Sequence, residues 1–73
     1  MMEVELLETT NPTFKYLQGS KVKVKDFRIG LIIWFGDFHT SLLQKIEYKY
    51  CKNNKAIITA HTLNSVYKFK VKE

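Results

Sequence analysis

Apolar and polar residues alternate along most of this 73-residue chain, which is the period of a β-strand with one buried face. In residues 2–8, Val4 and Leu6 alternate with glutamates, and Pro12 ends the strand because proline cannot donate to a ladder. Residues 21–25 place Val22 and Val24 on one face and three lysines on the other. Phe14 and Tyr16 fit a short extended piece between these two strands.

Residues 28–35 differ from this pattern because both of their faces are apolar. One face carries Ile29, Leu31, Ile33 and Phe35, and the other carries Ile32 and Trp34. This arrangement predicts a central or strongly curled strand, with a bend or bulge at Gly30 and a turn at Gly36.

Residues 41–50 fit two structures. Ser41 and Gln44 match a capping box, and Leu42, Leu43, Ile46 and Tyr50 lie on one helical stripe. Ile46, Tyr48 and Tyr50 equally alternate with charged residues, and the tyrosines favour a strand. We expect a single helical turn near Ser41 followed by a strand, and a helix over 41–50 is the alternative.

Two hairpins are predicted after residue 45. A three-residue loop at 52–54 pairs Tyr50 with Ala56 and Tyr48 with Ile58, and a two-residue loop would shift this register by one. A turn around Asn64 then returns the last strand. One apolar face results, made of Ile46, Tyr48, Tyr50, Ala56, Ile58, Ala60, Tyr67, Phe69 and Val71.

These elements predict one all-β domain over residues 1–73. It has five or six short antiparallel strands curled into a barrel or half-barrel of SH3-like or OB-like size. An α+β fold with a short helix at 41–50 is the alternative. A chain of this length gains only roughly 3–5 kcal/mol of net stability from its core.

Charge is distributed unevenly along the chain. Lys+Arg number 12 and Asp+Glu number 7, which gives a net charge of +5. Residues 2–8, however, contain glutamates and no basic residue. These acids either pair with lysines across the sheet or keep an edge strand soluble, and we favour the edge strand. The lone cysteine, Cys51, indicates a reducing, cytoplasmic setting, and the longest apolar run, 31–35, is too short to span a membrane.

The sequence contains few residues that could perform catalysis or bind a metal. His39, His61 and Cys51 match no metal-binding spacing, and the three glycines form no phosphate loop. We therefore expect a protein that is not an enzyme and that uses no metal or cofactor.

Two groups of residues are candidates for binding. Trp34, Phe35 and Phe38 surround the Gly36 turn and would anchor a larger protein. Lys21, Lys23, Lys25, Lys68, Lys70, Lys72 and His61 form a basic face that would bind anions or nucleic acid.

The high share of lysine over arginine predicts that any nucleic-acid binding is tolerant of sequence and sensitive to salt. A third interpretation is capture of a phosphate-bearing small molecule or nucleotide between subunits. A homodimer would also cover excess apolar surface, with residues 2–8 pairing across a two-fold axis.

The segment 57–69 includes Thr62-Leu63-Asn64-Ser65-Val66-Tyr67. It resembles the closing hairpin of short, uncharacterised accessory proteins of phages and mobile elements. The resemblance implies a small inhibitory or accessory factor that acts by stoichiometric binding to a host or defence protein. It assigns no functional residue.

Overall fold

The computed structural model describes residues 2–24, 27–35, 38–51 and 55–72. In these residues the elements run in the order β1 (Met2–Thr9), the 3-10 helix η1 (Pro12–Leu17), β2 (Lys21–Val24), β3 (Trp34–Phe35), β4 (Phe38–His39), β5 (Lys45–Cys51), β6 (Lys55–His61) and β7 (Val66–Lys72). The all-β prediction is confirmed. No helix in this described part has the length and apolar character needed to cross a membrane.

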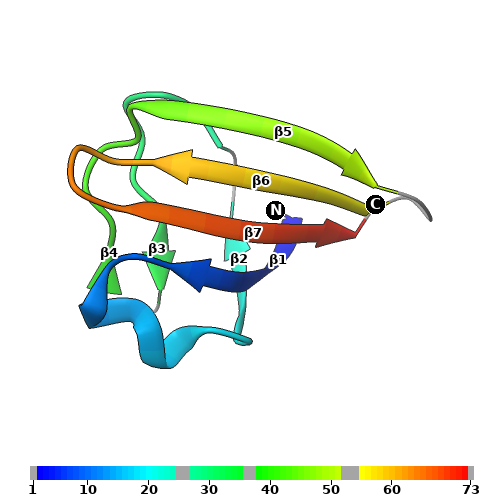
Figure 1. The fold of residues 1–73 in the computed structure, drawn as a ribbon, viewed down its shortest axis with the longest axis horizontal. Helices are drawn as coiled ribbons and strands as arrows, with labels where there is room; N and C mark the ends of the chain where they lie inside the picture. Colours follow the sequence, from blue (N-terminus) through cyan, green and yellow to red (C-terminus); the bar gives the residue numbers. More distant parts are fainter. Residues whose placement is uncertain (1, 25–26, 36–37, 52–54, 73) are drawn as a thin grey trace.

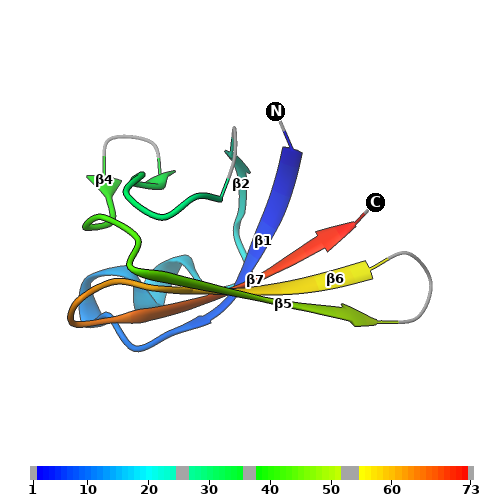
Figure 2. The same cartoon turned by 90° about the horizontal axis from the view of Figure 1, so that it is seen from above.

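Five strands form one antiparallel sheet in the order β2-β1-β7-β6-β5, and β3 and β4 form a separate two-stranded sheet (Figure 1). The large sheet is open, with β2 and β5 at its edges, so it is curled but does not close into a barrel. Seen from above, β3 and β4 stand over one end of the sheet, and β5 and β6 extend beyond them at the other end (Figure 2).

β1 lies inside the sheet, between β2 and β7. The interpretation of residues 2–8 as an edge strand is therefore wrong, and so is a dimer built by pairing that edge. The register of β1 against β7 shifts between Leu6 and Glu8, which leaves one extra residue on β1. Val4 and Leu6 before this bulge and Thr9 after it are all buried, because the bulge changes which residues face the core.

The predicted hairpin register is confirmed. Tyr50 pairs with Ala56 and Tyr48 with Ile58, and across the next strand pair Ile58 lies opposite Phe69. Residues 52–54, the loop itself, lie outside the described residues. The face of this sheet that carries Val4, Ile58 and Phe69 is called the core face below, and the opposite face is called the outer face.

Two local predictions are wrong. Residues 45–51 are strand and residues 41–44 contain no helical turn, so neither the helical turn near Ser41 nor the helix over 41–50 forms. Residues 12–17 form a 3-10 helix instead of an extended piece, because Pro12 suits a first turn and the side-chain oxygen of Asn11 accepts the Thr13 N–H at 3.0 Å. The buried Phe14 ring of this helix lies 5.9 Å from that of Tyr67.

The two-faced strand predicted for 28–35 does not form. Only Trp34 and Phe35 are strand, because Gly30, at φ +89°, turns the chain before them. Residues 27–35 and 38–43 instead form a largely irregular ribbon, called the β3–β4 ribbon below. Backbone hydrogen bonds join its two halves: the Gly30 N–H donates to the Leu43 carbonyl at 2.8 Å, and the Thr40 N–H donates to the Ile33 carbonyl at 2.9 Å.

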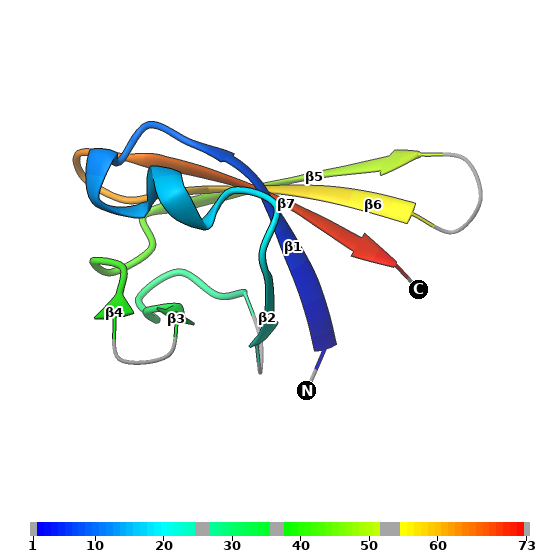
Figure 3. The ribbon, with the colours of Figure 1, turned by 90° about the horizontal axis from the view of Figure 1, so that it is seen from below.

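The core lies between the core face and this ribbon. From the ribbon, Phe27, Ile33 and Leu43 are buried, and the Phe27 and Phe69 rings are 5.2 Å apart. Among the side chains that the structure describes, the apolar core consists of Val4, Leu6, Phe14, Val24, Phe27, Ile33, Leu43, Ala56, Ile58, Ala60, Tyr67, Phe69 and Val71. Figure 3 shows the ribbon and β2 standing on this side of the sheet.

Candidate functional site

The outer face carries most of the predicted basic residues, but register places acids beside many of them. Lys21 and Lys23 of β2 lie opposite Glu5 and Glu3 of β1. Such opposite-charge pairs stabilise a sheet by fractions of a kcal/mol and lower the field that attracts a phosphate. The acids of residues 2–8 therefore lie opposite lysines across the sheet. This is the alternative to the edge-strand interpretation.

The strand β7 continues this pattern. The Lys68 Nζ lies 3.0 Å from a Glu8 carboxylate oxygen, and Lys70 lies opposite Glu5 on one side and Ile57 on the other. Lys25 lies outside the described residues, and for Lys72 only the backbone is described, opposite Lys55.

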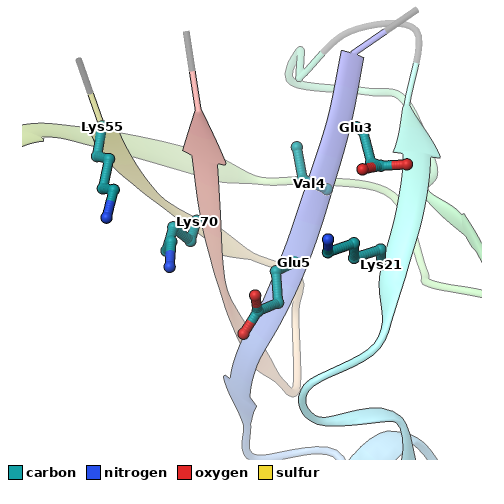
Figure 4. Close-up of a pocket in the computed structure, with 6 residues that line it drawn as sticks. All are labelled: Glu3, Val4, Glu5, Lys21, Lys55 and Lys70. Carbon is teal, nitrogen blue, oxygen red and sulfur yellow. The ribbon is translucent and has the colours of Figure 1, made fainter. Parts of the chain in front are cut away.

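A shallow depression of about 230 Å³ opens on the outer face and is lined by residues of the four successive strands β2, β1, β7 and β6. Figure 4 shows its lining, with the Glu5 carboxylate between Lys70 and Lys21 and with the Lys55 ammonium beside that of Lys70. Glu3 and Val4 complete the lining. Because two carboxylates stand among three ammonium groups, the depression is of mixed charge and does not concentrate positive potential.

His61 belongs to a small polar cluster on the same face. Its Nε2 lies 3.3 Å from Oε2 of Glu47, and the Lys45 Nζ lies 3.2 Å from Oε1 of Glu47. The hydrogen bond with His61, followed by the hydrogen bond and attraction of Lys45, holds the pKa of the Glu47 carboxyl below its ordinary value. The Lys45 and Glu47 side chains of this cluster are solvent-exposed, and that of His61 is partly exposed. Within the described residues, no three of the His, Cys, Asp and Glu side chains gather into a metal site.

Trp34 is exposed on the β3–β4 ribbon. Its side chain is 53% exposed, and its ring centroid lies 4.7 Å from that of His39, its register partner. The side chains of the other two predicted anchors, Phe35 and Phe38, lie outside the described residues, although their backbones pair with each other.

Three further apolar side chains on the ribbon are exposed: Ile29 at 69%, Leu31 at 43% and Leu42 at 53%. Leu31 and Leu42 lie close together because the Leu43 N–H donates to the Leu31 carbonyl at 2.8 Å. Alternation places Ile29 and Leu31 on one face with Ile33, but of these three residues only Ile33 is buried. The four exposed residues Ile29, Leu31, Trp34 and Leu42 are called the ribbon patch below.

Tyr48 and Tyr50 are also exposed, at 56% and 74%. They lie on the core face as predicted. Figures 2 and 3 show that the end of β5 extends past the ribbon. Alternation identifies the face of a residue correctly, but it cannot show how far the covering layer reaches.

No protein-family model matches the sequence, and comparisons with curated proteins and with solved structures also gave no match. Function must therefore be inferred from the residues and their geometry.

Proposed function

We propose that this protein is a non-enzymatic binding factor that docks stoichiometrically on a larger protein through the ribbon patch. The observation that carries the proposal is the half-exposed indole of Trp34 on a ribbon that holds three more exposed aliphatic side chains. An exposed tryptophan is a typical anchor of a protein interface, because its large ring gains much by losing water.

The backbone under the patch supports this proposal. The ribbon is fixed to the sheet by the buried side chains of Ile33, Thr40 and Leu43. The Thr40 hydroxyl accepts the Ile33 N–H at 3.0 Å and donates to the Ser41 carbonyl at 2.8 Å. A patch on such a scaffold is ordered before it meets a partner, so docking loses little conformational entropy.

The charge pattern favours a protein partner over a nucleic acid. Lys68 forms an ion pair with Glu8, and Lys21 and Lys23 lie opposite glutamates in the strand register, so phosphate contacts there would have to compete with these carboxylates. An accessory or inhibitory role in a phage or mobile element remains part of the proposal, supported only by the resemblance of residues 57–69.

The proposal is tested by affinity capture of the partner protein and then by titration with the purified partner. Immobilised protein should retain one cellular protein reproducibly, and Trp34→Ala and Leu42→Ala should each weaken that retention at least about tenfold. Tyr16→Ala is the matched control, because Tyr16 is an aromatic residue on η1 that is even more exposed than Trp34, at 68% against 53%.

The purified partner is then titrated against the free protein. Trp34 is the only tryptophan of the chain, so its emission should shift to the blue as the indole leaves water. Retention that survives both ribbon substitutions, or an emission spectrum that does not move at saturation, would refute docking through the ribbon patch.

A further inference from the structure

The outer edge of β5 is an unpaired strand edge. β5 is the last strand of the sheet, and its seven residues, Lys45–Cys51, pair with β6 on one side only within the described chain. Figure 1 shows this edge along the border of the molecule. β2, the other edge, is four residues long, and short edges resist sheet extension.

Other features of β5 fit an interface. It contains no proline, and its pairing with β6 continues without a bulge from Lys45 to Cys51. Tyr48 and Tyr50 stand exposed on its core face. A long straight edge beside exposed aromatic residues is the surface on which a further strand adds.

We propose that a second copy of this chain occupies this edge, with the two β5 strands antiparallel across a two-fold axis at Tyr48. Such an axis pairs residues whose numbers are equally distant from the central one. A centre at Tyr48 is the one that pairs all residues from 45 to 51.

Among the centres within one residue of Tyr48, the charges on the outer face favour this register. With the centre at Tyr48, Glu47 lies opposite Lys49 of the second copy, and the symmetry repeats the pair. With the centre one residue earlier, Glu47 would face its own copy, and Lys45 would face Lys49. With the centre at Lys49, two lysines would face each other. Like charges directly opposite destabilise a strand pair, so both alternatives are disfavoured.

The core face is complementary in the same register. Tyr48 lies opposite Tyr48 of the second copy, and Ile46 lies opposite Tyr50. Aromatic pairs and aromatic–β-branched pairs are among the most favourable cross-strand neighbours. The two-fold contact thus covers both exposed tyrosines. It uses a different surface from the ribbon patch, so either proposal can fail without the other.

Cysteine cross-linking tests the register directly. In a Cys51→Ser background, Tyr48→Cys places two thiols opposite each other, with Cα atoms about 4.5–5.5 Å apart, within reach of a disulfide. Tyr50→Cys in the same background is the control, because its two copies are offset by four residues, about 13 Å along the strand. We expect a disulfide-linked dimer under mild oxidation for Tyr48→Cys and not for Tyr50→Cys.

Charge reversal gives a second, independent test by sedimentation at low salt. The wild type should be a concentration-dependent dimer, and Lys49→Glu should raise its dissociation constant about tenfold by setting a carboxylate against Glu47 of the second copy. Lys55→Glu changes the net charge equally on the neighbouring strand and should leave the constant unchanged. The double variant Glu47→Lys/Lys49→Glu should restore dimerisation.

A wild type that stays monomeric at millimolar concentration overturns the proposal. So does a dimer that responds equally to Lys49→Glu and Lys55→Glu, or one in which Tyr50→Cys cross-links as readily as Tyr48→Cys. Circular dichroism of each variant checks that the sheet is retained, and exposed positions such as Tyr48 and Lys49 tolerate substitution well.

Discussion

Ile33 and Ile29 provide a matched pair for testing how the β3–β4 ribbon sits on the sheet. Strict alternation places both on one face, but the structure buries Ile33, at 1% exposure, and leaves Ile29 69% exposed. Substitution by valine removes one methylene from each and keeps a β-branched side chain, so strand propensity changes little.

The expected magnitudes follow from burial. A fully buried methylene contributes about 0.8 kcal/mol, and incomplete collapse of the site raises the cost of Ile33→Val to about 1 kcal/mol. For Ile29, less than a third of the side chain is removed from water, so the loss is about 0.2 kcal/mol. A domain with roughly 3–5 kcal/mol of stability tolerates both changes.

Urea unfolding followed by far-ultraviolet circular dichroism measures the difference in the free energy of unfolding. With a slope of about 1 kcal/mol per molar urea, Ile33→Val lowers the midpoint by about 1 M and Ile29→Val by about 0.2 M. Equal shifts in the two variants would refute the ribbon geometry, because they would place both isoleucines in one environment.

Three further predictions concern other parts of the molecule. Asn11→Ala removes both the cap of η1 and the hydrogen bond from the Asn11 side-chain amide to the Tyr67 hydroxyl, 2.8 Å long, and should lower the free energy of unfolding by about 1–2 kcal/mol in the same urea assay. The pKa of Glu47 is lower in the folded chain than in the unfolded chain, so its stabilising effect is complete above the unfolded pKa and is lost as the pH falls through the folded pKa. Thermal melts of dilute protein in acid should therefore depend less on pH in Glu47→Gln, and an unchanged profile would contradict the assignment. Oligonucleotide affinity at low salt, measured by anisotropy, should fall more in Lys55→Gln than in Lys23→Gln, because Lys23 lies opposite Glu3; an equal loss would show that this carboxylate does not screen Lys23.

The hairpins of β5, β6 and β7 could be predicted because each strand pairs with the strand next to it in the sequence. A one-residue slip moves a whole strand to the other face, so the alternation of Tyr48, Tyr50, Ala56 and Ile58 favours the register that places these residues on one face. The turn lengths that connect these strands are short enough to be read from the sequence.

The position of β1 could not be predicted in the same way. Its partner β7 is more than fifty residues away, and alternation states which face a strand buries but not which strands flank it. A signal was nevertheless present in the charges. Glu3, Glu5 and Glu8 match lysines at 23, 21 and 68 across the two neighbouring strands.

The ribbon patch could be predicted only in part, for a different reason. Gly30 takes a positive φ, and a turn of this kind breaks the period on which alternation depends. Trp34 was singled out because a small core has no room for every large side chain of residues 28–35. Ile29 and Leu31, which alternation places on one face with Ile33, are exposed, whereas Ile33 is buried.

The same matching of opposite charges predicts how the free edge of β5 is paired. Within the sheet, Glu3 and Glu5 lie opposite lysines of β2, and Glu8 forms an ion pair with Lys68 of β7. On β5, Lys45 and His61 share Glu47, whereas Lys49 lies opposite the apolar Ile57. Lys49 can gain a directly opposed carboxylate only across the free edge, and a second β5 centred on Tyr48 supplies one. Opposite charges face each other between β1 and its neighbours within one chain, and the same matching favours the register centred on Tyr48 between two chains.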